Sequence, residues 1–161
     1  MSAAHTGLRF RARSCVALVL ASLLAFPLPS LAADEAVDFD AVMAERFADW
    51  HDAGMPEPLL AQIGSGAEVW RDHCAACHGD LGEGGGGYAS PVIDTRGLDK
   101  LRTGHRLFIY NRGMMPFQEP GSLDEEAYWQ VTAWMMAMNG WLDTLDAPLG
   151  ADNARGVAIE P

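Results

Sequence analysis

Apolar residues recur at helical spacing in four stretches of the chain. The clearest stretch precedes Gly140 and has one apolar face, made of Tyr128, Val131, Trp134, Met135 and Met138. Three further stretches predict helices at about residues 38–51, 65–74 and 104–111. No stretch alternates in the manner of a β-strand, and no repeat is present. The pattern therefore predicts an all-α fold.

Polar residues and glycines predict where these helices begin and end. Ser65 with Glu68, and Ser122 with Glu125, have the S-x-x-E spacing of a capping box, so we expect helices to begin at both serines. The stretch 79–97 is rich in glycine, with an unbroken run at 84–87, and predicts a long loop.

The first 32 residues differ from the rest. Three arginines precede a nearly continuous apolar run from Cys15 to Phe26, and small residues at Ser30 and Ala32 follow two prolines. This is the layout of a secretory signal peptide, cleaved after Ala32 or, as the second choice, after Ala33. The run is shorter than the roughly 20 residues that span a bilayer. We therefore expect a periplasmic protein without stable membrane insertion, and an uncleaved anchor is the alternative.

Signal removal makes an acidic chain more acidic. The full chain has a formal net charge of −11, and loss of the three arginines leaves eight basic against 22 acidic residues, or −14. Such a charge argues against nucleic acids as partners and suits docking to a basic patch on another protein.

The remaining residues divide into three parts. Residues 33–63 are predicted to form an N-terminal helical extension, residues 64–141 a compact domain, and residues 142–161 a loose C-terminal tail. The compact part has fewer than 80 residues. A core of that size is marginal without a staple or a cofactor.

The segment Cys74-Ala75-Ala76-Cys77-His78 has the C-x-x-C-H pattern of covalent haem attachment. On a helix end, cysteines three residues apart share a face, so both sulfurs can meet the edge of one porphyrin as thioethers. His78 is then placed to bind the iron. Structural zinc needs about four ligands, and no other cysteine follows the signal. A dithiol redox site or a plain disulfide would use the same two cysteines, and both stay open at this point.

A second iron ligand is predicted in the loop after the third helix. A methionine thioether is one such ligand in haem cytochromes, and Met115 precedes Pro116, which stiffens the backbone. Adjacent residues point in different directions, so Met114 is an alternative and not a second ligand. The remaining candidates are histidines: His51 in the extension, His73, which we expect to be held away from the iron, and His105.

Over residues 64–141 the chain resembles the class I (mitochondrial-type) cytochrome c family. The features that carry the resemblance are Gly66, Trp70, the Cys74–His78 motif, Met115-Pro116, Val131 and Trp134. The resemblance implies a small helical domain wrapped round one covalently bound haem c. It also implies that a glycine and an aromatic residue on the first helix of the domain cross an aliphatic and an aromatic residue on the last.

The stretch from Met115 to Trp134 is also similar to small cytochromes, or cytochrome subunits, that accept electrons from periplasmic dehydrogenases. This similarity implies an electron carrier with redox protein partners rather than an enzyme. A five-coordinate haem sensor or a peroxidase-type enzyme is the alternative. Arg96, Arg102 and Arg112 are candidates to pair with haem propionates, or are ordinary surface arginines. We expect an apolar haem wall from Pro91, Val92, Ile93, Leu98, Leu107, Phe108, Tyr110 and Phe117.

Overall fold

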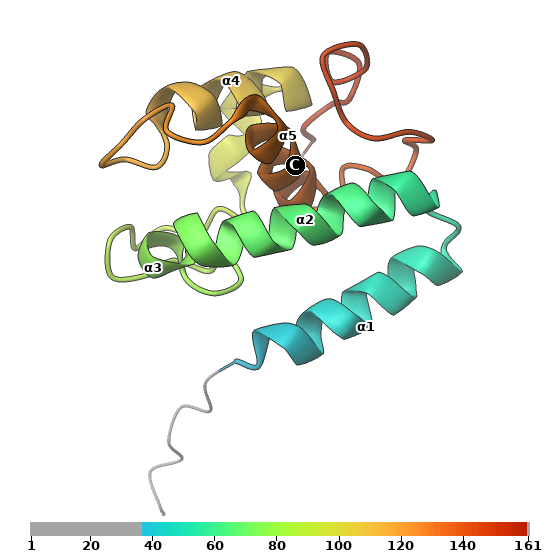
Figure 1. The fold of residues 1–161 in the computed structure, drawn as a ribbon, viewed down its shortest axis with the longest axis horizontal. Helices are drawn as coiled ribbons and strands as arrows, with labels where there is room; N and C mark the ends of the chain where they lie inside the picture. The colour runs from blue at the N-terminus through green and yellow to red at the C-terminus, as the bar shows by residue number, and fades with distance from the viewer. Residues whose placement is uncertain (1–36, 161) are drawn as a thin grey trace, which may run out of the picture. The chain divides into compact units, whose positions relative to one another are not determined.

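The computed structural model describes residues 37–160, which contain five α-helices and one 3₁₀-helix (Figure 1). They are α1 (Phe39–Asp52), α2 (Glu57–His73), α3 (Ala75–His78), η1 (Arg96–Leu101), α4 (Gly104–Met114) and α5 (Glu125–Met138). No strand is assigned within this range; Thr103 and Ala158 form an isolated bridge. The predicted all-α fold is confirmed. The predicted signal peptide lies outside the described residues and stays a prediction.

The centre of the fold is the crossing of α2 and α5, which Figure 1 shows with α5 behind α2. A Cβ atom on Gly66 would overlap the backbone of Gln130 and lie 2.8 Å from the Cβ of Trp134. One turn along α2, Trp70 stacks on Trp134 with ring centroids 4.5 Å apart, and both rings are buried. The crossing implied by the family resemblance is therefore present, and glycine is required where the two backbones meet.

This contact predicts a destabilising effect of a single methyl group. Gly66→Ala should lower the free energy of unfolding by about 2 kcal/mol, because overpacking against backbone outweighs the better helix propensity of alanine. Denaturant unfolding of the haem-loaded protein measures the change. Gly64→Ala is the matched control on the same helix, since its Cβ would lie 3.5 Å from the ring of Phe47, an ordinary contact. Equal stability of the two variants would contradict the crossing.

The helix starts differ from the predicted capping boxes. Helix α2 begins at Glu57, so Ser65 lies in its interior; the N-cap is Pro56, without a side-chain hydrogen bond. A first helical turn tolerates proline. The buried Leu59 anchors the first turn of α2 in the core. The N-cap of α5 is Asp124, whose carboxylate accepts from the Ala127 N–H at 2.7 Å, and not Ser122. The predictions for α1, α4 and the body of α5 are confirmed.

The prediction of a loose C-terminal tail is wrong. Leu142, Leu149 and Ile159 are buried in the same core cluster as the helices. Gln62 of α2 holds Leu149 by two hydrogen bonds of 2.8 Å, one to its carbonyl and one from its N–H. Sparse apolar residues among glycines and prolines gave no periodic signal, yet they fill the space beside α2 and α5.

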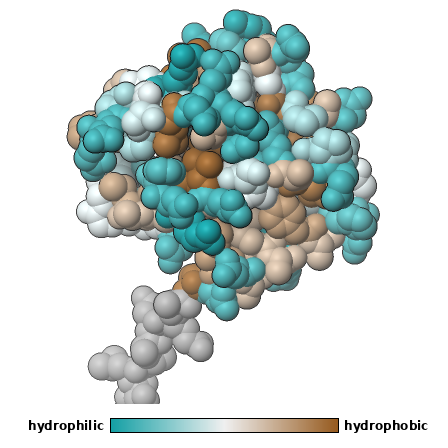
Figure 2. Space-filling model, in the orientation of Figure 1, coloured by the Kyte–Doolittle hydropathy of each residue, from teal (hydrophilic) through white to brown (hydrophobic). Residues whose placement is uncertain are grey.

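Within residues 37–160, no helix is both long enough and apolar enough to cross a membrane. Hydrophilic side chains cover much of the face shown in Figure 2, with apolar residues between them.

Candidate haem-binding site

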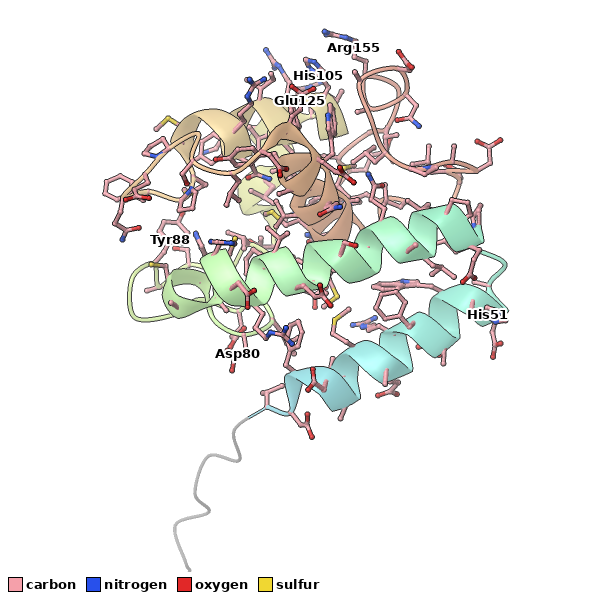
Figure 3. The ribbon with its side chains drawn as sticks, in the orientation of Figure 1. His51, Asp80, Tyr88, His105, Glu125 and Arg155 are labelled. Atoms are coloured by element: carbon pink, nitrogen blue, oxygen red, sulfur yellow. The ribbon has the colours of Figure 1, made fainter. Side chains whose placement is uncertain are left out.

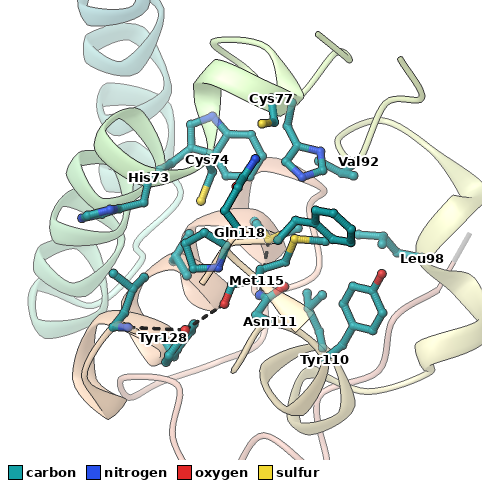
Figure 4. Close-up of a pocket in the computed structure, with 18 residues that line it drawn as sticks. His73, Cys74, Cys77, Val92, Leu98, Tyr110, Asn111, Met115, Gln118 and Tyr128 are labelled. Atoms are coloured by element: carbon teal, nitrogen blue, oxygen red, sulfur yellow. Dashed lines mark hydrogen bonds between the residues drawn. The ribbon is translucent and has the colours of Figure 1, made fainter. Parts of the chain in front are cut away.

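An apolar pocket lies where α2, α3, α4 and α5 meet the loop that follows α4 (Figure 4). Five residues of the predicted apolar wall line it: Val92, Leu98, Leu107, Tyr110 and Phe117. Pro91, Ile93 and Phe108 do not; Ile93 packs near Gly82, and Phe108 stacks on Trp129. The pocket also contains Cys74, Cys77, His78 and Met115. The four predicted site residues are thus brought together.

Cys74, Cys77 and His78 come from a single turn at the end of α2. Cys74 caps α2, and its carbonyl accepts from the N–H groups of Cys77 at 3.1 Å and His78 at 3.0 Å. The turn consists of Cys74 and the short helix α3 that follows it, and it carries both thiols and the imidazole to the pocket. The two cysteines are not joined by a disulfide. Burial, with a smaller contribution from Cys77, raises the pKa of Cys74 to about 12, so it is a neutral thiol.

The imidazole of His78 is suited to binding a metal. Burial lowers its pKa, which favours the neutral ring that metals require. Its Nδ1 is buried and has no hydrogen-bond partner. A buried polar atom without a partner is unfavourable, so this ring fits a site in which a bound group completes its interactions. Trp70 and Tyr88 flank the ring, with centroids 5.8 and 5.1 Å away.

Of the two adjacent methionines, only Met115 lines the pocket. It is the C-cap of α4, its N–H donates to the Asn111 carbonyl at 2.9 Å, and the peptide bond to Pro116 is cis. Met114 is 49% exposed. The structure thus places Met115, and not Met114, within reach of a group in the pocket.

The three candidate histidines lie in different environments. His51 is on α1 and exposed (Figure 3), and its Nδ1 lies 3.7 Å from the Asp52 carboxylate. His105 lies on α4 and does not line the pocket. His73 does line the pocket, although its side chain is exposed. In Figure 4 its ring points away from Met115, and the expectation that His73 is held away from the iron stays a prediction.

Three polar residues of the pocket, Asn111, Gln118 and Tyr128, were not identified as site residues from the sequence. Asn111 is buried on α4, where its amide donates to the Thr132 hydroxyl at 3.1 Å and to the Met135 sulfur at 3.5 Å. Asn111 comes four residues after Leu107 and so shares its helical face, and this spacing is the feature of the sequence that could have placed Asn111 in the pocket. The apolar pattern places Tyr128 only on the buried face of α5, yet its hydroxyl donates to the Met115 carbonyl at 2.8 Å.

The three arginines considered as propionate partners do not line the pocket. Arg112 lies at the surface, 3.5 Å from Glu125. In the described part of the chain, no arginine, lysine or carboxylate contributes to the pocket lining. The lining is apolar apart from the thiols, His73, His78, Asn111, Gln118 and the tyrosine hydroxyls.

Residues 61–135 match the family model described as cytochrome c oxidase, cbb3-type, subunit III. Every residue of the pocket, from Trp70 to Met135, falls within that range. The helical domain is consistent with a small all-α domain of the cytochrome c type. It therefore binds haem c, with its iron, covalently, and the thiols, the unpartnered imidazole and the apolar lining of the pocket fit this group.

Two further proteins are similar to part of this chain. A thiosulfate dehydrogenase of Stutzerimonas stutzeri (strain A1501) is 35% identical over 91 residues, which cover 50% of this chain and 29% of that protein. The chain thus matches less than a third of that relative. The structure of the sulfane dehydrogenase SoxCD from Paracoccus pantotrophus has a TM-score of 0.48 and 24% identity, covering 60% of this chain and 52% of that one.

Proposed function

We propose that the mature protein is a periplasmic monohaem cytochrome c that carries single electrons. Cys74 and Cys77 would hold the haem through thioethers, and His78 and Met115 would be the two protein ligands of its iron. One observation carries this proposal: two thiols, an imidazole without a hydrogen-bond partner and a thioether, from two separate segments, line the same apolar pocket.

The bound haem supplies an iron that changes between the ferrous and ferric states. Each part of the chain has a role in that change. The turn from Cys74 to His78 fixes the attachment points relative to the imidazole, and the Met115 thioether favours the reduced state and so raises the potential. The apolar lining keeps water out of the pocket and so limits how far the surroundings reorganise when the iron changes oxidation state. With His78 and Met115 both as ligands, the iron would have no free position for a gas or for peroxide.

The partner that we propose is a redox protein, in particular a periplasmic dehydrogenase. The similarity to a protein named thiosulfate dehydrogenase supports a role beside an oxidoreductase. The formal charge of −14 after signal removal favours a partner with a basic docking surface. The signal-like N-terminus supports export to the periplasm.

A redox titration of the purified protein, followed by its visible spectrum, tests the proposed carrier. We expect one reversible transition with a one-electron slope, and no change in the reduced spectrum when carbon monoxide is added. Rapid binding of carbon monoxide by the reduced wild type would contradict the carrier and favour a five-coordinate sensor or peroxidase-type enzyme.

A further inference from the structure

The hydroxyl of Tyr128 connects the two ends of the loop that carries Met115. It donates to the Met115 carbonyl at 2.8 Å, and it accepts from the Leu123 N–H at 3.4 Å (Figure 4). The tyrosine is 1% exposed and belongs to α5, the helix that crosses α2 at the centre of the fold. The hydroxyl is therefore a fixed point at the edge of the core.

The loop itself has few other attachments. Between Pro116 and Ser122 its backbone hydrogen bonds are local, from the Glu119 N–H to the Pro116 carbonyl and from the Ser122 N–H to the Glu119 carbonyl. Among the described residues, the side-chain hydrogen bonds that tie the backbone of this loop to α5 are both made by the Tyr128 hydroxyl.

Met115 lies where the loop leaves α4, and its backbone is held from two sides. Its N–H donates to the Asn111 carbonyl of α4, and its carbonyl accepts from Tyr128 of α5. The first bond continues the helix; the second is the contact that directs the chain back against the core. Loss of the second bond would free the Met115 backbone while leaving α4 intact.

We propose that Tyr128 is a positioning residue, which holds the backbone of Met115 so that its thioether stays directed into the haem pocket. This inference rests on the proposed function, because it requires that Met115 bind the iron. A thioether is a weak ligand, so the occupancy of the sulfur–iron bond depends on how firmly the loop is held. Removal of the hydroxyl should make the sixth position easier for another ligand to take.

Imidazole competition on the ferric protein tests this role. Tyr128→Phe keeps the ring and its packing and removes only the hydroxyl. Free imidazole should displace the sulfur ligand at concentrations about fivefold lower than in the wild type, the effect of losing one ordinary hydrogen bond. Loss of the weak sulfur–iron band at the red end of the ferric spectrum gives the apparent Kd. Far-ultraviolet circular dichroism measures folding separately.

Gln130→Ala is the matched control. Gln130 lies on the same helix, does not line the pocket, and donates one exposed side-chain hydrogen bond to Glu126 at 3.3 Å. Its substitution should leave the imidazole Kd unchanged. An unchanged Kd in Tyr128→Phe, or an equal shift in both variants, would overturn the positioning role.

A second measurement covers the case in which Tyr128→Phe does not fold. In the wild type, proton NMR of the reduced protein should show slower solvent exchange of the Tyr128 hydroxyl proton than of the Tyr110 hydroxyl proton. Equal exchange rates would overturn the inference. Failure of the proposed function gives a different result, because the wild type itself would then lack the sulfur–iron band. The positioning role of Tyr128 would be wrong in that case as well.

Discussion

Replacing both Cys74 and Cys77 with serine is expected to abolish covalent haem attachment. A serine hydroxyl forms no thioether, and both thiols line the pocket that also contains His78. The variant should give no haem stain on a denaturing gel, whereas the wild type stains at the mass of the mature chain. The variant should also be strongly destabilised, because a domain of this size depends on its cofactor to complete the core.

Ala76→Ser is the control for this experiment. Ala76 lies between the two cysteines and does not line the pocket, so the substitution adds a hydroxyl to the same turn without touching the site. It should retain the wild-type haem stain. Persistent staining of the double serine variant would contradict attachment at Cys74 and Cys77.

Met115→Ala is expected to cause the largest change in redox behaviour. Loss of the thioether removes the ligand that favours ferrous iron, so the midpoint potential should fall by on the order of 100 mV or more. The sulfur–iron band of the ferric spectrum should disappear, and the reduced variant should bind carbon monoxide. Haem staining on a denaturing gel should persist, because neither cysteine is changed.

The neighbouring methionine provides the control for this substitution. Met114 is 49% exposed and does not line the pocket. Met114→Ala should therefore keep the band and a potential close to that of the wild type. If Met114→Ala lost the band and Met115→Ala kept it, the proposed ligand would be wrong.

Features that depend on short-range spacing could be predicted from the sequence. The periodic apolar residues of α5 indicated a buried helix, and all five residues of the predicted face are buried. The family resemblance carried by Gly66, Trp70, Val131 and Trp134 implied a close crossing of two helices, which the overlap at Gly66 bears out. One turn of the chain contains Cys74, Cys77 and His78, so their proximity could be predicted from their spacing alone.

Features that depend on long-range packing could not be predicted in this way. The start of α2 is set by the burial of Leu59 and not by a polar cap, so Ser65 was misleading. The tail became part of the core through Leu149 and its bonds to Gln62, 87 positions away in sequence. The hydrogen bond from the Tyr128 hydroxyl to the Met115 carbonyl forms because the loop at Met115 returns to α5. The periodicity of apolar residues contains no information about that return.

The iron environment of the ferric wild-type protein, measured by X-ray absorption at the iron edge, tests the proposed axial ligands most directly. We predict one sulfur neighbour and five nitrogens, four from the porphyrin and one from His78. Six nitrogens, with no sulfur, would contradict this ligand set and would identify a second histidine as ligand. His73 would then be the first candidate, since it also lines the pocket.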